Sequence, residues 1–300
     1  MSAVSRETIR TTIDGRELTI SNLDKVFYPD SGFTKGEMID YYVRIAPFML
    51  PHLADRPLTM KRFPDGVDGS FFFEKHAPRH APKWVRHVSV PSTAAGDAVV
   101  YSIVSDVATL VWAANLATIE FHVPLWSVRR RRKLPGPPDH MVFDLDPGEG
   151  TTMVECCAVA RHIADLLAES SRDSVAKTSG SKGLQLYVPL GGPTTWDKVR
   201  KEAHQIAIRL EADHPDLVVS NMRKSLRRGK VLVDWSQNHP AKTTVAAYSL
   251  RARPDPTVST PVTWEEVVTC HEKADPDLLR FTAEDVLARV NQHGDLFAPV

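Results

Sequence analysis

The sequence has little cysteine and no segment typical of export or membrane insertion. Only three cysteines occur among the 300 residues, at positions 156, 157 and 270. Their spacing matches no zinc motif and supports no disulfide framework, so we expect free thiols in a reduced compartment. The polar start lacks an apolar signal core, and no apolar run approaches the length needed to span a membrane. These absences predict a cytoplasmic protein.

The sequence also lacks an excess of charge of either sign. Lysine and arginine together number 37, and aspartate and glutamate together also number 37. Any binding of nucleic acid must therefore depend on local groups of charge rather than on the field of the whole protein. With 42% hydrophobic and 25% charged residues and no internal repeat, the composition is that of an ordinary globular protein. The length permits one large domain or two fused lobes.

The most informative stretch is residues 141–148, which read Met-Val-Phe-Asp-Leu-Asp-Pro-Gly. The apolar start predicts a buried strand, and the Pro-Gly pair ends it. Side chains two apart on a strand point to one face, so Asp144 and Asp146 are expected side by side, with Leu145 turned into the core. Two such carboxylates repel each other, and a divalent cation such as Mg²⁺ or Mn²⁺ relieves the repulsion. The motif alone is equally compatible with a solvated strand end.

Apolar spacing predicts an alternation of strands and helices along the chain. Thr34 and Glu37 form a capping box for a helix over residues 35–53. Further helices are expected over 106–117, 152–169, 195–212, 264–270 and 282–293, and strands over 18–20, 99–104, 119–122, 184–190, 231–238 and 243–251. The basic run 129–133 is expected to be a solvated loop.

Two other stretches suggest phosphate and metal chemistry. Residues 179–183 read Ser-Gly-Ser-Lys-Gly, in which the glycines let the backbone curl and Lys182 supplies a fixed cation, so a phosphate cradle is predicted. Asp234 stands alone in the apolar run 231–238, where a carboxylate is costly unless it is paired or bound to metal. It is the natural third ligand beside Asp144 and Asp146.

Lysines occur beside aromatic residues between Lys61 and Lys75, around the run Phe71-Phe72-Phe73. Cations for phosphate and flat rings for bases are what a nucleic-acid surface needs. Taken alone, however, the pattern favours buried phenylalanines with a solvated rim of lysine, because most aromatic side chains are buried.

Six stretches together resemble the polymerase domain of the bacterial end-joining ligase D, in the archaeo-eukaryotic primase superfamily. They read Asn-Leu-Asp-Lys-Val-Phe-Tyr-Pro at 22–29, Phe-Phe-Glu-Lys at 72–75, Glu-Phe-His-Val-Pro at 120–124, Val-Phe-Asp-Leu-Asp-Pro-Gly at 142–148, Thr-Ser-Gly-Ser-Lys-Gly-Leu at 178–184 and Val-Asp-Trp-Ser-Gln-Asn at 233–238. They appear in the family's order across most of the chain. The resemblance also covers stand-alone relatives that fill gaps in excision repair.

The resemblance implies a role for each matching residue. The catalytic metal ligands would be Asp144, Asp146 and Asp234, and the incoming nucleotide would contact His122, Ser179, Lys182, Gln237 and Arg251. A 5′-phosphate on the downstream strand would be bound by Asn22, Lys25, Lys35 and Lys61, and the template would be supported by Phe72 and Phe73.

The implied fold is a primase-type α/β (α+β) module, with an RNA-recognition-like catalytic sheet beside an N-terminal α/β lobe. It would form a single domain over 1–300, with a DNA-end lobe at about 1–125 and a catalytic lobe at about 126–300. Two Mn²⁺ or Mg²⁺ ions, ribonucleoside or deoxynucleoside triphosphates, and gapped, overhanging or 5′-phosphorylated DNA would be its cofactors and substrates.

The chain has no ligase nucleophile motif of the form Lys-x-Asp-Gly, since Lys61-Arg62-Phe63-Pro64-Asp65-Gly66 has the wrong spacing. We therefore expect a separate ligase and an end-binding Ku-type partner, or a longer chain of which this is one piece. Two other functions stay open. A manganese-dependent sugar-nucleotide transferase would use Asp144 and Asp146, and a non-catalytic DNA-end-bridging module would use the basic residues alone.

Overall fold

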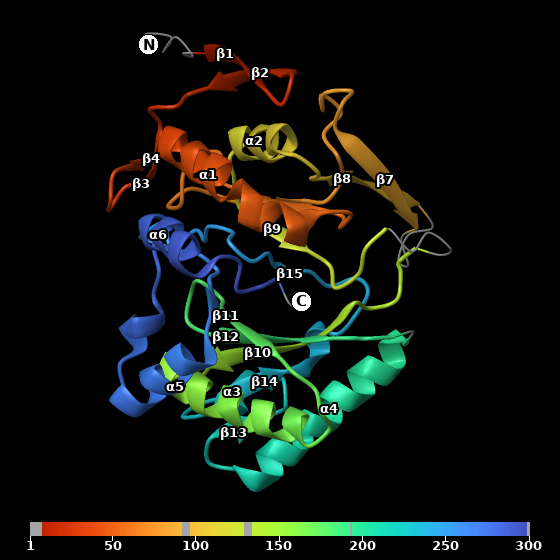
Figure 1. Cartoon of the computed structure of the whole chain (residues 1–300), viewed down its shortest axis with the longest axis vertical. Helices are drawn as coiled ribbons and strands as arrows, with labels where there is room; N and C mark the ends of the chain where they lie inside the picture. Colours follow the sequence, from red (N-terminus) through yellow and green to blue (C-terminus); the bar gives the residue numbers. More distant parts are fainter. Residues whose placement is uncertain (1–7, 92–96, 129–133, 193, 299–300) are drawn as a thin grey trace.

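The computed structural model describes residues 8–91, 97–128, 134–192 and 194–298, and the basic run 129–133 lies outside these ranges. Figure 1 shows two halves along the long axis: strands β1 to β9 with α1 and α2 in one half, and a central sheet with α3, α4 and α5 in the other. The C-terminus lies between the two halves. None of the described helices is both long and apolar enough to cross a membrane.

The first half is formed mainly by the described residues between 8 and 123. Its strands are β1 (Thr8–Ile13), β2 (Arg16–Ser21), β3 (Val26–Tyr28), β4 (Phe33–Thr34), β5 (Thr59–Arg62), β6 (Phe72–Glu74), β7 (Arg86–Pro91), β8 (Ala98–Ile103) and β9 (Thr118–Val123), and its helices are α1 (Lys35–Leu53) and α2 (Val107–Asn115). The predicted capping box at Thr34 and Glu37 is confirmed at the start of α1. The buried face of α1, which includes Met38, Tyr42 and Ile45, joins the larger of the two main cores.

The described chain from residue 140 onwards forms the central sheet, one strand of a second sheet and four α-helices. Its strands are β10 (His140–Pro147), β11 (Val175–Thr178), β12 (Leu184–Pro189), β13 (Val218–Val219), β14 (Val231–Asp234), β15 (Thr244–Val245) and β16 (Pro261–Val262). Its α-helices are α3 (Met153–Ala168), α4 (Trp196–Asp213), α5 (Trp264–Lys273) and α6 (Ala283–His293), with 3₁₀ turns η1 (Lys224–Leu226), η2 (Trp235–Gln237) and η3 (Pro276–Leu279).

The central sheet has the strand order β13-β14-β10-β12-β11-β16. Among its middle four strands, each pair of neighbours is antiparallel. Along the chain these strands alternate with α3 and α4 in the order β10-α3-β11-β12-α4-β14. This is the split βαβ arrangement, so the predicted RNA-recognition-like sheet is confirmed. Alternate residues such as Phe143 and Leu145 pack with α3, α4 and α5 in the second core. The residues between them face the other half of the molecule.

The C-terminal part of the chain returns to the first half. Strand β15 pairs with β9 in the second sheet, whose order is β15-β9-β5-β6. Tyr248, Leu250, Val286 and Val290 are buried in the same core as α1 and α2. The lobe boundary near residue 125 stays a prediction, and the core it would divide contains segments from both sides of it.

Two predicted strands are wrong in extent. The strand expected over 231–238 ends at Asp234, because the Asp234 side chain accepts a hydrogen bond from the backbone of Ser236 and caps η2. The strand expected over 243–251 is reduced to β15, and Tyr248 has a positive φ of 66° that interrupts extended structure. This segment is apolar because it lies buried between the two halves.

Candidate active site

The three aspartates lie together at one end of strands β10 and β14. Asp144 and Asp234 are direct partners in the antiparallel ladder, and Asp146 follows two residues along the same face of β10. Asp144 and Asp234 are partly buried, whereas Asp146 is exposed. Leu145 is fully buried on the opposite face, as predicted. The fold therefore brings the two separate acidic stretches to one place.

The acids disturb one another's protonation. Burial and the neighbouring carboxylate of Asp146 raise the pKa of Asp144 to about 7, and Asp234 contributes to the same rise. Burial and Asp234 likewise raise the pKa of Asp146. Neighbouring carboxyl groups are hard to ionise at the same time because their negative charges repel each other. A divalent cation bound to their oxygen atoms would stabilise the charged form of these groups. The donor chemistry at this place therefore fits a divalent metal.

The ligand set is not closed in this structure. In the described ranges, no three His, Cys, Asp or Glu side chains are gathered tightly enough to hold a metal ion. Asp234 is bonded to its own neighbours: its Oδ1 accepts from the backbone N–H and the hydroxyl of Ser236, and its Oδ2 accepts from Gln237 Nε2 at 3.1 Å. Gln237, which the resemblance assigns to the nucleotide, here contacts a metal-ligand candidate instead.

The glycine-containing turn lies beside the acids. A Cβ on Gly183 would lie 2.1 Å from the carbonyl oxygen of Leu145, so only glycine lets the turn approach β10 this closely. Ser179 Oγ accepts hydrogen bonds from the backbone N–H groups of Ser181 and Gly183. The predicted convergence of N–H groups is therefore present, but it is directed at a side chain of the turn itself. Lys182 is exposed.

Glu120, which sequence reasoning did not single out, connects two cationic side chains and a histidine. This carboxylate is only 2% exposed. It contacts Lys61 Nζ at 3.1 Å, His122 Nε2 at 2.9 Å and Arg251 Nε at 3.3 Å. Burial alone would raise the pKa of Glu120, but the hydrogen bond with His122 and the charges of Arg251 and Lys61 lower it well below its usual range. Burial lowers the pKa of His122 in spite of Glu120.

One cleft is lined by two of the three aspartates and by several of the basic residues, whereas Asp234 and Glu120 are not part of its lining. Its volume is about 440 Å³, and its lining includes His122, Asp144, Asp146, Ser179, Lys182, Gln185, Arg227, Arg251 and Arg253. The carboxylates and the cations thus face one space, which is the arrangement that nucleotidyl transfer requires. Two of the unpredicted lining residues had a signal in the sequence: Arg227 lies in a basic run, and Arg253 follows Arg251. Gln185 had none before the strand register was known.

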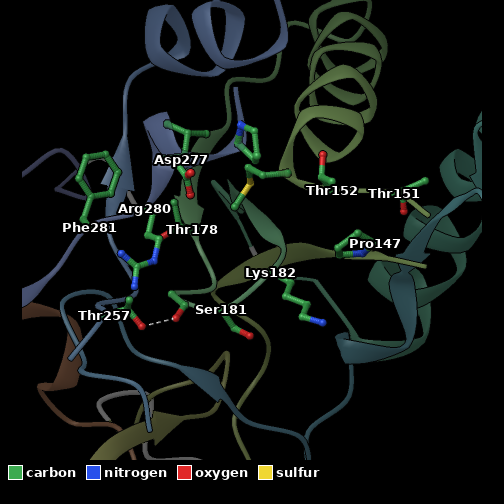
Figure 2. Close-up of a pocket in the computed structure, with 14 residues that line it drawn as sticks. Pro147, Thr151, Thr152, Thr178, Ser181, Lys182, Thr257, Asp277, Arg280 and Phe281 are labelled. Carbon is green, nitrogen blue, oxygen red and sulfur yellow. Dashed lines mark hydrogen bonds between the residues drawn. The ribbon is translucent and has the colours of Figure 1, made fainter. Parts of the chain in front are cut away.

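A second cavity of about 330 Å³ lies on the other side of the same turn. It shares Pro147, Ser181 and Lys182 with the cleft. Figure 2 shows Lys182 extending away from Asp277 and Arg280, which line the far part of this cavity. The turn therefore contributes to the lining of both spaces.

The four residues implied in 5′-phosphate binding fall into two places. Lys25 Nζ donates to the carbonyl of Pro64 and pairs with Asp65 at 2.8 Å. Lys35 is 4% exposed, and its Nζ contacts the Ser21 carbonyl and Asn115 Oδ1. Burial and the charge of Lys25 lower the pKa of Lys35 to about 8.

Asn22 adopts a positive φ of 56°, and its carbonyl oxygen accepts a hydrogen bond from the backbone N–H of Lys25. Lys61 belongs to the Glu120 group, and its Nζ lies 4.5 Å from the centre of the Phe71 ring. Thus Asn22, Lys25 and Lys35 are neighbours, whereas Lys61 contacts Glu120, which also contacts the cleft residues His122 and Arg251.

The aromatic run on and before β6 lies at the surface. Phe71, Phe72 and Phe73 are 53%, 43% and 55% exposed, so the interpretation of these rings as core residues is wrong. The Arg62 guanidinium lies 5.1 Å from the centre of the Phe72 ring. Exposed rings next to cations form the kind of surface on which bases stack.

Fold and site together define a primase-polymerase, a class of nucleotidyltransferase. A solved structure, the polymerase domain from Mycobacterium tuberculosis ligase D in complex with DNA, matches this chain with a TM-score of 0.87 and 44% sequence identity. The match covers 94% of this chain and 97% of that one.

The chain belongs to the family of LigD primase-polymerase domains, which it matches over residues 34–297. It is 44% identical over 281 residues to the multifunctional non-homologous end joining protein LigD of Mycolicibacterium smegmatis, covering 94% of this chain and 36% of that protein. It is 30% identical over 279 residues to the bifunctional LigD of Bacillus subtilis, covering 93% of this chain and 43% of that protein. The chain thus spans well under half the length of these curated relatives.

Proposed function

We propose that the protein is a template-dependent polymerase of DNA repair that adds ribonucleotides or deoxynucleotides at gaps and broken ends. The observation that carries the proposal is the cleft in which Asp144 and Asp146 face Lys182 and Arg251. Carboxylates on one side and cations on the other suit a reaction in which a triphosphate is brought to a 3′-hydroxyl.

In this proposal, Asp144, Asp146 and Asp234 hold two divalent ions, with manganese as the preferred ion and magnesium as the alternative. When bound, such cations lower the pKa of the attacking hydroxyl and neutralise the charge that develops as pyrophosphate leaves. Asp234 would exchange its hydrogen bonds with Ser236 and Gln237 for the cation.

The protein's own cations would hold the nucleotide. Lys182 is exposed beside the acids, and Arg251 is fixed by Glu120 and by the carbonyl of Ser179. Both are placed to bind phosphate oxygens, and Ser179 would supply a hydroxyl from the same turn. Gln237 would turn to the nucleotide when Asp234 turns to the metal. These roles require positioning rather than proton transfer.

His122 would serve as a phosphate contact in this arrangement. Its Nε2 lies 2.9 Å from a carboxylate oxygen of Glu120, so the ring is already oriented by the buried acid. The negative charge of an incoming triphosphate would raise the pKa of His122 and favour its cationic form.

The DNA would lie over the first half of the molecule. Among the described contacts, the Lys35 ammonium donates to two neutral acceptors. Its third N–H can then donate to a phosphate oxygen. A terminal 5′-phosphate carries two charges and would be bound by Lys35 with Asn22 and Lys25, while Lys61 would contact the same strand from beside Glu120. The exposed rings of Phe72 and Phe73 would support the template base.

The named relatives act in non-homologous end joining. We infer that this chain fills gaps in the same kind of repair, in the cytoplasm at the nucleoid, with a ligase and a Ku-type end-binding protein as partners. Gap filling in excision repair would use the same cleft and the same substrates.

Primer extension on a gapped duplex tests the proposal. The duplex carries a 5′-phosphate or a 5′-hydroxyl on its downstream strand and is supplied with manganese and either ribonucleotides or deoxynucleotides. We expect templated addition, with tighter binding of the phosphorylated gap at low salt. DNA binding without extension would favour the end-bridging alternative, and hydrolysis of a sugar nucleotide would favour the transferase alternative.

A further inference from the structure

A row of four polar side chains crosses the central sheet. Asp234 on β14 is opposite Asp144 on β10, Asp144 is opposite Gln185 on β12, and Gln185 is opposite Lys177 on β11. Residues directly opposite each other in a ladder point to the same face of the sheet. All four side chains therefore lie on the face turned away from α3.

Lys177 forms the fixed end of this row. Its side chain is fully buried, and its Nζ contacts Gln185 Oε1 at 2.7 Å, the Val245 carbonyl at 3.0 Å and Ser259 Oγ at 2.6 Å. Ser259 donates its own proton to the carbonyl of Thr178, so its oxygen accepts from Lys177. Three acceptors around one nitrogen match the three N–H groups of an ammonium, although burial favours the neutral amine.

The neighbours of Gln185 fix the direction of its amide. In its ammonium form Lys177 can only donate, so the amide oxygen of Gln185 faces Lys177 Nζ and the amide nitrogen faces the other way. Gln185 Nε2 accordingly donates to Asp144 Oδ1 at 3.0 Å. The flipped amide would set donors against each other at Lys177 and acceptors against each other at Asp144.

We propose that Lys177 and Gln185 position the Asp144 carboxylate for its divalent cation, Gln185 by holding Oδ1 and Lys177 by holding Gln185. The inference rests on the proposed function, because it requires a cation at Asp144. A carboxylate with one oxygen held cannot rotate freely, so less conformational entropy is lost when the ion binds. Outer residues that orient a metal ligand in this way typically contribute 10- to 100-fold in metal affinity.

A purely structural role would not need this chemistry. A buried lysine is costly, and a methionine of similar length would fill the same space without a hydrogen-bonding requirement. Here the buried Lys177 Nζ is connected through one amide to a cleft acid, and Gln185 itself lines the cleft. The two residues are therefore positioning residues, and metal affinity is the property that distinguishes them from packing residues.

Binding of Mn²⁺ to the full chain without nucleotide tests the inference, with free Mn²⁺ followed by electron paramagnetic resonance. The variants are Lys177→Met, Gln185→Leu and the double variant, with Gln185→Asn as a milder change that keeps an amide too short to span both neighbours. We expect each single variant to weaken Mn²⁺ binding by about tenfold. The double variant should be no weaker than Gln185→Leu, because the two residues act in series.

Tyr41→Phe is the matched control, because it removes a buried hydrogen bond of 2.8 Å to the Tyr248 carbonyl and leaves the four side chains of the row in place. Its Mn²⁺ affinity should equal that of the wild type, whatever its thermal stability. If Lys177→Met does not fold, the Mn²⁺ affinities of Gln185→Leu and Gln185→Asn test the positioning role.

Two results separate the possible failures. If the wild type does not bind Mn²⁺, or Asp144→Asn binds it equally well, the proposed metal site is wrong. If Asp144→Asn loses Mn²⁺ but folded Gln185→Leu and Gln185→Asn bind it like the wild type, the metal site stands and the positioning role is overturned.

Discussion

Asp144 and Asp234 are directly opposite each other on neighbouring antiparallel strands, although they are far apart in the sequence. Their carboxylates share one end of the sheet with Asp146, where burial and mutual repulsion oppose ionisation. The pairing brings two weak acidic motifs together in one site whose charge depends on pH.

The first prediction concerns stability and pH. The pKa of Asp144 is raised from 3.8 to about 7 in the folded chain. Between these values the folded state holds a proton that the unfolded chain releases, so this group's contribution to stability is lost as pH rises through that range. A bound cation would offset the repulsion. Mn²⁺ should therefore raise the melting temperature more at pH 8 than at pH 5.5, as measured by scanning calorimetry.

The same experiment on Asp144→Asn provides the control, because the amide has no proton to lose. In that variant, the rise in melting temperature caused by Mn²⁺ should be nearly the same at pH 8 and at pH 5.5. An equal rise in melting temperature at both pH values in the wild type would argue against cation binding at these acids.

The second prediction concerns Glu120. Glu120→Gln removes the negative charge that Lys61, His122 and Arg251 share, and should lower the free energy of unfolding by about 3 kcal/mol at pH 7. The pKa of Glu120 is lowered in the folded state, so its contribution is present above the usual carboxylate pKa and is lost as pH falls. The gap between variant and wild type should shrink below about pH 4.

Denaturant titration measures this difference, with Asp40→Asn as the control. Asp40 forms an exposed pair with Arg44 at 3.4 Å, and its loss should cost less than about 1 kcal/mol. A Glu120→Gln variant that is no less stable than Asp40→Asn would show that the buried carboxylate does not stabilise the cations around it.

The third prediction concerns recognition of the DNA end. The pKa of Lys35 is lowered to about 8, so its ammonium loses its proton as pH rises through that value. The preference for a 5′-phosphate over a 5′-hydroxyl on gapped DNA should therefore weaken between pH 7 and pH 9.5, as measured by fluorescence anisotropy at constant salt. Lys35→Met should show little preference at any pH. A wild-type preference that does not change over this range would exclude Lys35 from the phosphate site.

Local sequence signals predicted the elements that depend on neighbours in the chain. The Thr34 and Glu37 capping box fixed the start of α1, and the alternation around Leu145 gave the correct face for Asp144 and Asp146. Such features follow from backbone geometry over a few residues, so one sequence is enough to find them.

Features that depend on strand register could not be predicted in this way. Gln185 contacts the site only because strand β12 pairs it with Asp144. Glu120 contacts Arg251 only because the fold brings a distant segment of the chain beside it. The apolar run through Tyr248 predicts a strand, but burial in the core produces the same apolar pattern without extended structure. Exposure of Phe72 and Phe73 likewise depends on what the fold leaves uncovered.

The central claim is that three aspartates hold the metal ions for nucleotide addition while the DNA surface is built elsewhere. Asp144→Ala, Asp146→Ala and Asp234→Ala should each abolish templated primer extension on a gapped duplex with manganese, and each should bind that duplex nearly as well as the wild type. Near-normal extension by any one variant would remove that residue from the metal site, and normal extension by all three would contradict the account.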